Sequence, residues 1–509
     1  MRNPSPEVAH EAAATASGLL AAIDMGSNSF RLEIGQIRDG RYRRQLYLKE
    51  TVRLGAGLDA EGMLTDEAAE RGLVCLRRFA GSLAGMAPGQ VRAVATQTLR
   101  EARNRNAFLA RAQAALGLPI EVISGREEAR LIYAGVAHLQ PSDKRRLVID
   151  IGGRSTEMIL GRGPLAQQAE SFRIGSVSLS MRYFPDGRFT AEAFRAAQIA
   201  AGAELEEAMA QFTPSRWSEA LGSSGTAGAV SEVLQACGVT DGSITPSSLR
   251  WLMRQCIAAG SIDKLDLPGM KNDRRAVIGG GLAILYTLAT HFRIEALLPA
   301  KGALRQGVIV DLHERLLAQQ RVSGHDLRDE SVKQLQHRFA VDTAQARRVR
   351  DMALAFYGQI APEAGAEARR ELLWSAELHE LGAMVSHHDH HRHSAYLIAH
   401  VDAAGFSQSQ QRRLAELALG QRGGLRKVEE ALKDEAVRLQ MLCLRLAVIK
   451  CHARGEIDLQ ALRLERQGRL LKLRFSPAWA DSHPRTLHLL REEADGWNRS
   501  GVLQLQLQG

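Results

Sequence analysis

Two segments of the chain share one pattern of apolar and small residues. At 19–35 an apolar run leads into the small-residue stretch MGSNS and then into the alternating segment FRLEIG. At 147–161 a second apolar run passes through IGGRS into TEMILG. Alternation on both sides of a glycine-containing turn is typical of a β-hairpin. The pattern therefore predicts two hairpins of the same design.

The two hairpins form an internal repeat. IDMGSNS at 23–29 aligns without gaps on IDIGGRS at 149–155, and a glycine follows at the same distance in both. Asp24 and Asp150 are equivalent in this alignment. Because a repeat marks a repeated structural unit, we expect each hairpin to open its own α/β domain, with a cleft between the two.

The rest of the pattern divides the chain further. Periodic helical segments at 67–83, 107–115, 127–137 and 191–212 alternate with short strands at 91–95 and 120–123, which favours α/β layers. From about 310 the segments 326–339, 342–359, 367–381, 409–419 and 428–453 predict helices, and strands return at 461–475 and 502–507. The predicted domains are 1–135 and 136–312, both α/β, a helical domain at 313–455 and a small α/β cap at 456–509.

Composition narrows the class of protein. Five scattered cysteines without a CxxC pair indicate neither a disulfide framework nor a thiolate zinc site. Neither a signal peptide nor a run of about 20 apolar residues is apparent, which predicts a cytoplasmic protein, with peripheral contact at the inner membrane face left open. The 66 Lys and Arg against 57 Asp and Glu give a net charge of +9, which favours polyanionic partners: nucleic acid, anionic lipid, nucleotide or polyphosphate.

The small-residue turns carry the candidate chemistry. Glycine and serine let backbone N–H groups and hydroxyls approach phosphate oxygens, and an aspartate just before the turn can hold Mg²⁺. A third such turn, at 220–227, precedes a helix expected at 229–235, where amides favour anions. Any one turn could be a plain connection, but together they predict a phosphate-binding set: Gly26, Ser27, Asn28, Ser29, Gly152, Gly153, Arg154, Ser155, Thr156, Gly222, Ser223, Ser224, Gly225 and Thr226.

Six segments now indicate a family. AAIDMGSNSFRLEIG, TQTLREARN, VISGREEARLIYAGV, LVIDIGGRSTEMILG, ALGSSGTAGAV and KGALRQGVI resemble, in order and spacing, the exopolyphosphatase and guanosine pentaphosphate phosphatase family. The resemblance implies an α/β fold of two actin-like, ribonuclease-H-type domains that close over a phosphate chain with Mg²⁺. It also implies that a helical HD-like domain and a small cap follow, and that the protein is a homodimer.

The resemblance also implies roles for single residues. Glu128 matches the family's water-activating base, whereas its neighbour Glu127 is our candidate for a capping carboxylate at the helix start. The resemblance assigns Asp24 and Asp150 to the metal, with Asp150 also counted among the catalytic residues.

Three further residues follow from the same match. Glu157 is expected to position metal or water as a catalytic carboxylate. Arg100 is expected to clamp substrate oxygens. Arg274 matches a basic position near the cleft, although an arginine on a solvated helix face would look the same.

Three features depart from the family pattern. Arg154 stands where the family has a small residue: a positive φ there would make arginine costly, and an ordinary φ would let it bind phosphate. Gln306 stands where glutamate is frequent. In the helical domain, His379-Glu380 and the run 387–393 look like an HD-type site, yet glutamate replaces the aspartate and no upstream histidine is evident as a further ligand.

We expect the helical domain to extend a basic groove for a long substrate instead. The candidate contacts are Arg412, Arg413, Arg422, Arg426 and Lys427.

The first functional hypothesis is an exopolyphosphatase that releases orthophosphate from polyphosphate, processively, without a specific nucleic-acid partner. The alternative is a guanosine pentaphosphate 5′-phosphohydrolase that uses the same residues. A catalytically weak polyphosphate or nucleotide sensor is the alternative of another class, and the presence of Asp24, Glu128 and Asp150 argues against it. A sugar kinase or chaperone ATPase of the same superfold is disfavoured by the ISGREEARLI segment.

Overall fold

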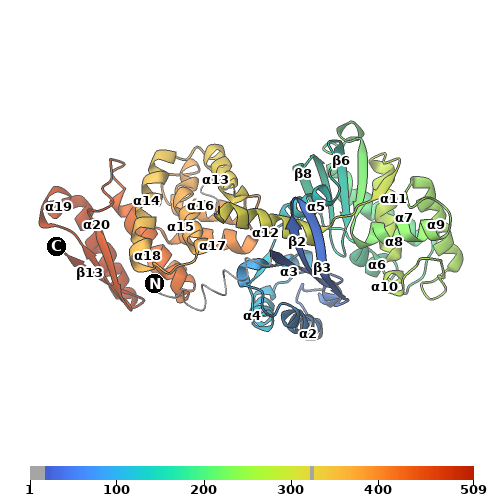
Figure 1. Cartoon of the computed structure of the whole chain (residues 1–509), viewed down its shortest axis with the longest axis horizontal. Helices are drawn as coiled ribbons and strands as arrows, with labels where there is room; N and C mark the ends of the chain where they lie inside the picture. The colour runs from blue at the N-terminus through green and yellow to red at the C-terminus, as the bar shows by residue number, and fades with distance from the viewer. Residues whose placement is uncertain (1–17, 321–325) are drawn as a thin grey trace. The chain divides into compact units, whose positions relative to one another are not determined.

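The computed structural model of the chain describes residues 18–320 and 326–509 (Figure 1). It divides the chain into two compact units, which meet in sequence at residue 324. Residues 18–320 are called unit 1 and residues 326–509 unit 2. No helix in the described residues is long and apolar enough to cross a bilayer.

Unit 1 contains two five-stranded sheets of the same design. The first has the order β3-β2-β1-β4-β5, built from β1 (Leu19–Met25), β2 (Phe30–Arg38), β3 (Arg41–Glu50), β4 (Val91–Ala95) and β5 (Ile120–Val122). The second has the order β10-β9-β6-β7-β8, built from β6 (Arg145–Ile151), β7 (Thr156–Arg162), β8 (Leu165–Phe172), β9 (Glu219–Ser223) and β10 (Leu297–Pro299). Read from the hairpin edge the two orders are equivalent, so the predicted duplicated α/β architecture is confirmed.

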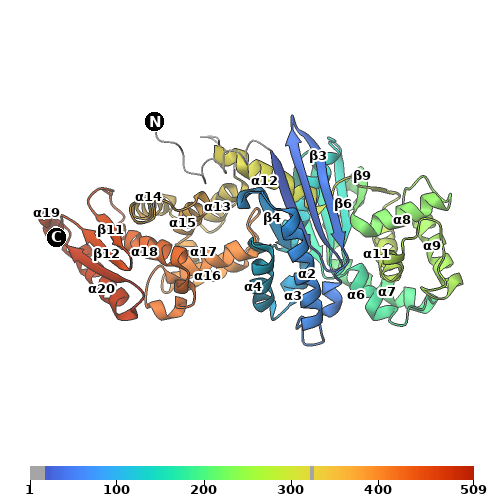
Figure 2. The ribbon, with the colours of Figure 1, turned by 60° about the horizontal axis from the view of Figure 1, so that its bottom comes forward.

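The helices of unit 1 lie on both faces of these sheets (Figure 2). They are α2 (Asp66–Ser82), α3 (Gln97–Glu101), α4 (Arg105–Leu116), α5 (Gly125–Leu139), α6 (Ser176–Tyr183), α7 (Ala191–Leu205), α8 (Ser224–Ala236), α9 (Pro246–Ala259), α10 (Asn272–Arg275), α11 (Ile278–His291) and α12 (Leu304–Gln320). The boundaries expected at 135 and 312 fall inside α5 and α12. These two helices pack so closely that a methyl group on Gly307 would collide with the Leu131 carbonyl.

Alternation along β1 and β6 sorts their side chains between separate cores. In β1, Ala21, Ile23 and Met25 join the core shared with α2 and α4. The residues between them, Leu20 and Ala22, join a central core with α5 and α12. Strand β6 alternates in the same way, with Val148 in that central core and its neighbours in the core of the second lobe. Because successive side chains face opposite sides, Asp24 and Asp150 are directed to the α5–α12 side.

Unit 2 consists of helices followed by a three-stranded sheet, β11-β12-β13. Its elements are α13 (Leu327–Arg338), α14 (Thr343–Ile360), α15 (Ala366–Glu377), α16 (His390–His400), α17 (Gln408–Gly420), α18 (Glu435–Lys450), β11 (Arg463–Gln467), β12 (Leu470–Arg474), α19 (Pro477–Ser482), α20 (Pro484–Ser500) and β13 (Gln504–Gln508). The helix expected from 428 starts later, because the Asp434 carboxylate caps α18 by accepting the Ala436 and Val437 amides. Two short 3₁₀ turns precede it.

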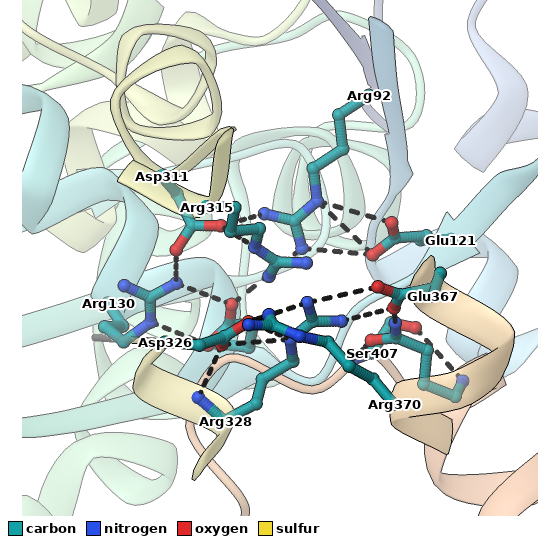
Figure 3. Close-up of polar contacts among 12 residues, drawn as sticks. Arg92, Glu121, Arg130, Asp311, Arg315, Asp326, Arg328, Glu367, Arg370 and Ser407 are labelled. Atoms are coloured by element: carbon teal, nitrogen blue, oxygen red, sulfur yellow. Dashed lines mark hydrogen bonds and ion pairs between the residues drawn. The ribbon is translucent and has the colours of Figure 1, made fainter. Parts of the chain in front are cut away.

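A buried ionic network ties α12 to α5 and β4 (Figure 3). The Asp311 carboxylate on α12 accepts from Arg92 of β4 at 2.7 Å, from Arg130 of α5 at 2.5 Å and from Arg315 at 2.6 Å. Arg130 also binds Glu127 through both oxygens at 2.8 Å. Burial alone would raise the pKa of Asp311, but Arg315, Arg130 and Arg92 lower it below its ordinary range. The carboxylate therefore stays ionised inside the core.

Unit 2 has a buried network of its own, also drawn in Figure 3. Arg328 is almost fully buried, donates to Asp326 at 2.9 Å and contacts Glu367. Its guanidinium lies 4.4 Å from the centre of the Trp374 ring. Charge and aromatic contact together hold the start of α13 against α15.

Replacing Asp311 by alanine should lower the free energy of unfolding by about 3–5 kcal/mol, because Arg92, Arg130 and Arg315 lose a shared buried partner. Urea titration followed by circular dichroism would measure the loss. The matched control is Glu70→Ala, since Glu70 pairs with Arg77 and Arg111 at the surface with half of its side chain exposed. That change should have a much smaller effect, because solvent screens an exposed ion pair. Equal effects of the two substitutions would contradict a structural role for the network.

Candidate active site

The two hairpin loops are held by the elements that follow them. The Ser27 carbonyl of the β1–β2 loop accepts from the Gly55 amide at 2.8 Å, and its hydroxyl accepts from Thr98 at 2.8 Å. In the β6–β7 loop the Gly152 carbonyl accepts from the Ser176 amide at 2.9 Å. Anchored loops keep their free N–H groups and hydroxyls in fixed positions, which a phosphate site needs.

The third predicted loop is shorter than expected, because α8 begins at Ser224 and not near 229. Ser224 has φ 64°, a left-handed conformation that costs a non-glycine residue free energy and is frequent at functional sites. Its hydroxyl and that of Thr226 both donate to the Ile151 carbonyl, at 3.1 and 2.9 Å. The first turn of α8, with its free amides, is thus tied to the end of β6.

These loops line one cavity of unit 1 together with the strand ends and α5. The predicted site residues that line it are Asp24, Gly26, Ser27, Asn28, Ser29, Glu128, Asp150, Gly152, Gly153, Ser155, Ser224, Gly225, Thr226 and Arg274. It is also lined by residues that the sequence pattern did not indicate: Arg31, Thr96, Ile132, Ile151, Ser176, Ala303, Leu304 and Arg305.

Three predicted phosphate-binding residues lie behind the cavity wall. Thr156 donates its hydroxyl to the Ile174 carbonyl at 2.6 Å, and Ser223 donates to the Gly302 carbonyl at 3.0 Å. The Gly222 carbonyl accepts from the Ala300 amide. None of the three is among the residues that line the cavity. Their hydrogen bonds fix the strand ends from which the lining residues project.

The sequence left open whether Arg154 is strained by a positive φ or binds phosphate, and the structure supports neither. Its φ is not in the left-handed region, so arginine is not strained there, and its side chain does not line the cavity. The guanidinium instead pairs with Glu101 at 2.8 Å and donates to the Gly55 carbonyl at 3.0 Å. Arg154 therefore joins the second loop to the first lobe of unit 1, and this pairing takes up the charge that we expected to hold phosphate.

Glu128 lies on the first turn of α5, directly in the cavity wall. Arg100 donates to its carboxylate at 2.8 Å and to the Ile123 carbonyl at 3.0 Å. Burial raises the pKa of Glu128 to about 7: Arg100 opposes the shift, and the charges of Asp24 and Asp150 reinforce it. A carboxyl group with this pKa can hold or release a proton near neutral pH, as a general base must. Glu127, by contrast, points into the ionic network with Arg130.

The second hairpin places two carboxylates opposite each other. Asp150 and Glu157 are paired across β6 and β7, and both are buried. Burial raises the pKa of Glu157 well above its ordinary value, and the charges of Glu128 and Asp150 add to it. Burial also raises the pKa of Asp150, while the nearby polar side chains of Ser224 and Ser223 and the charge of Arg31 oppose the shift. Glu157 is held by the Ser171 hydroxyl at 2.8 Å and stands behind the cavity wall.

The cavity also presents cations and unused hydrogen-bond donors. Arg31 lies opposite Asp24 in the β1–β2 register and contacts it at 3.4 Å, and Arg305 lies 3.6 Å from the same carboxylate. Among the described residues, Ser29 Oγ and Arg31 Nε of the cavity-lining residues are buried without a partner, as is the second terminal nitrogen of Arg100, which is not among the lining residues although it was predicted to clamp substrate. Buried donors without acceptors are costly, so the two donors of the lining residues favour an anionic ligand.

Gln306 stabilises the helix that carries Arg305. Its amide donates to both oxygens of the fully buried Glu33, at 2.7 and 2.8 Å, and Arg305 binds the same carboxylate at 3.1 Å. A glutamate at 306 would place a second negative charge against Glu33. In this chain, glutamine is the residue that fits this pocket.

The carboxylates suit a divalent cation shared with a ligand. No group of three metal-binding side chains is preassembled in the part of the chain that the structure describes. Asp150, however, has a raised pKa and faces Glu157 and Glu128, so negative charge is in excess on this side of the cavity. Mg²⁺ is commonly held by one or two carboxylates, with phosphate and water completing its shell. Asp150 and Asp24 are therefore suitable to hold it.

In unit 2 the histidine segment forms no comparable set. His379 is buried and its Nδ1 lies 2.7 Å from the Ala376 carbonyl, while Glu380 pairs with Arg454 at 2.5 Å. Of the arginines expected to contact a long substrate, Arg413 binds Glu371 at 2.9 Å. The HD-like assignment and the basic groove stay predictions.

The regions of the chain that match known protein families correspond to unit 1 and unit 2. Residues 34–316 match the Ppx/GppA phosphatase family, which is more than half of the sequence. The chain belongs to the Ppx/GppA phosphatase family. Residues 327–494 match domain III of Ppx/GppA phosphatases, so the family extends over unit 2 as well.

Solved structures similar to this Ppx/GppA family member include the following two. An exopolyphosphatase-like protein is 26% identical, with a TM-score of 0.53, over 59% of this chain and 98% of its own. An exopolyphosphatase from Cytophaga hutchinsonii is 24% identical, with a TM-score of 0.53, over 58% of this chain and 98% of its own. The latter supports the fold, and the family assignment indicates a phosphatase.

The raised pKa of Glu128 has a measurable effect on stability. A buried carboxyl group with a folded-state pKa near 7 and an ordinary unfolded value of 4.5 contributes stability at low pH that is lost as pH rises through 7. The side chain of Glu128→Gln stays neutral. The free energy of unfolding of this variant, relative to that of the wild type, should therefore rise by about 2 kcal/mol from pH 5 to pH 8.

Urea titrations of both proteins at the two pH values, with EDTA present, measure this difference. Glu67→Gln is the control, because Glu67 occupies the first turn of α2 with 89% of its side chain exposed. It should follow the wild type at both pH values. Parallel curves for Glu128→Gln and the wild type would show that the carboxyl group titrates normally.

Proposed function

We propose that the protein is an exopolyphosphatase, which hydrolyses the terminal phosphoanhydride bond of inorganic polyphosphate and releases orthophosphate. The observation that carries the proposal is the cavity of unit 1, where Arg31, Arg274 and Arg305 and the unused donors meet a carboxyl group whose pKa lies near 7. Phosphoryl transfer depends mainly on positioning and on stabilising charge, and these groups supply both.

Each part of the cavity has a task in this reaction. The amides and hydroxyls of the two hairpin loops and of the first turn of α8 bind the non-bridging phosphate oxygens, and Arg31, Arg274 and Arg305 neutralise their charge. Glu128 orients the attacking water and takes its proton, while Arg100 holds the carboxylate in place. Ser171 holds Glu157 behind this site, and the charges of Asp24 and Asp150 help to keep the pKa of Glu128 high.

Mg²⁺ fits this proposal, with Asp24 and Asp150 as its protein ligands. When bound, it would neutralise phosphate charge and orient the terminal group. Processive release, a homodimer and the HD-like nature of unit 2 are further predictions from the family resemblance. Guanosine pentaphosphate is the alternative substrate, because its 5′ end is the same kind of phosphoanhydride and the family includes enzymes of both kinds.

Phosphate release should be measured side by side on long-chain polyphosphate and on guanosine pentaphosphate, with Mg²⁺. Glu128→Gln should lose activity about 100-fold or more, because the general base is absent but the shape of the site is kept. The Glu67→Gln control should keep full activity. Activity of the wild type on guanosine pentaphosphate alone would identify the alternative substrate, and silence on both would favour a sensor.

Alanine substitutions of Arg274 and Arg154 should change KM to different extents, although both side chains were expected to contact substrate. Arg274 lines the cavity against Gly225, so Arg274→Ala should raise KM for polyphosphate about tenfold or more through loss of a charge-assisted contact. Arg154→Ala should change KM less than about threefold, because its charge is taken up by Glu101. Steady-state kinetics of the two variants compares them directly, and a larger KM effect from Arg154 would show that the side chain leaves Glu101 to bind substrate.

A further inference from the structure

Unit 2 contains a large cavity that the proposed reaction does not use. Its volume is about 1060 Å³, which is in the range of sites for small organic ligands. Residues from the 379–390 segment, the turn before α18, α18 itself and α20 line it, and all of them belong to unit 2.

One wall of this cavity is apolar. Leu425, Leu432, Val448, Ile449 and Leu489 contribute to it. Such a wall offers burial to a ring or another apolar group, and inorganic phosphate alone would leave that surface unused.

The rim carries positive charge that the protein does not neutralise. In the part of the chain that the structure describes, Arg422, Arg426 and Arg499 are exposed and form no ion pair with a carboxylate. By contrast, Arg445 binds Glu493 at 2.5 Å and Arg454 binds Glu380 at 2.5 Å. The paired arginines belong to the scaffold, whereas the three others are free to bind an anion. Arginine is the side chain best suited to bind a phosphate group through two parallel hydrogen bonds.

The floor of the cavity contains polar side chains whose hydrogen bonds are not all made. His390 is 7% exposed, and its Nε2 lies 3.3 Å from a terminal nitrogen of Arg422. If Nε2 accepts from that donor, Nδ1 must carry the hydrogen, and this atom is buried without a partner. Gln421 is 2% exposed, and its amide donates to the His379 and Ala418 carbonyls, but its Oε1 is unpartnered.

An apolar wall together with unpaired arginines at the rim favours an organic ligand that carries both an apolar group and an anionic group. A metal ion fits less well, because the Arg454 guanidinium already neutralises the Glu380 carboxylate. Glu429 and Glu492 also line the cavity, so a long polyanion would meet repulsion there that a compact phosphate on the arginine side avoids.

We infer that this cavity binds a small phosphorylated molecule with an apolar or aromatic body, in the manner of a nucleoside diphosphate. The phosphates contact Arg422 and Arg426, and the ring packs on the apolar wall above His390 and Gln421. This ligand site in unit 2 is separate from the phosphate-binding cavity of unit 1 and does not depend on the activity proposed for it.

ADP and inorganic pyrophosphate are the probes, titrated calorimetrically into the full-length protein without Mg²⁺. The wild type should bind ADP with a Kd below about 1 mM and pyrophosphate more weakly, because only ADP uses the apolar wall. Arg422→Ala/Arg426→Ala should weaken ADP at least about tenfold. The matched control is Arg485→Ala/Arg491→Ala, which removes the same charge from exposed positions of α20 outside the cavity, and it should stay within about threefold of the wild type.

Two further measurements keep the inference testable. Arg274→Ala, in the unit 1 cavity, should leave ADP affinity unchanged. Hydrogen exchange of the wild type should slow on ADP addition in peptides covering 421–432 and 484–500, a readout that needs no variant. The inference is wrong if ADP does not bind, or if Arg274→Ala removes binding. It is also wrong if Arg422→Ala/Arg426→Ala, made in the Glu128→Gln protein, weakens the binding of long-chain polyphosphate but leaves the binding of ADP unchanged. That result would make this surface part of a substrate groove.

Discussion

The architecture of unit 1 depends on the alternation of side chains along two equivalent strands, β1 and β6. In each strand one set of residues packs in an outer core, and the other set packs against the pair of helices α5 and α12. Asp24 and Asp150 belong to the second set, so burying the apolar neighbours forces both carboxylates toward the same helices. A shift of either strand by one residue would turn its aspartate into an outer core. Hydrophobic burial, and no direct attraction between the carboxylates, therefore brings the charged groups together.

The degree to which arginines neutralise each buried carboxylate then distinguishes the structural residues from those suited to chemistry. Glu127 and Glu128 are adjacent on the first turn of α5 and both are buried. Glu127 meets Arg130 and, through the network of Asp311, other arginines, whereas Glu128 meets one arginine and the charges of two carboxylates, Asp24 and Asp150. The same difference appears in the hairpins: Arg31 stands opposite Asp24, but Glu157 stands opposite Asp150. The two copies of the repeat thus have equivalent backbones but different charged side chains. The excess negative charge lies beside Glu128.

The sequence pattern was sufficient for features that depend on local periodicity. The hairpins, strand β4 and the α/β duplication follow from alternation and from the repeat, and the structure confirms them. Arg31 could have been found in the same way, because the hairpin register places it opposite Asp24. Arg305 gave no such signal, since its approach to Asp24 depends on how α12 packs. Arg154 shows the opposite failure: its position in a phosphate loop was clear, but its partners Glu101 and Gly55 lie far away in sequence. The late start of α18 reflects Asp434, a cap that a continuous apolar pattern conceals.

The two cavities differ in which charge is left uncompensated. In unit 1, carboxylates with raised pKa values stand beside arginines and donors without partners, so a ligand there must satisfy both signs, as a phosphate with a divalent cation does. In unit 2, the carboxylate that would attract a cation is already paired with Arg454, and the arginines at the rim are the groups left free. Arg454 holds that pairing from a left-handed backbone conformation, φ 56°, in which its amide donates to the Cys451 carbonyl at 3.0 Å. By neutralising Glu380, Arg454 leaves the unpaired arginines at the rim as the groups that favour an anionic ligand.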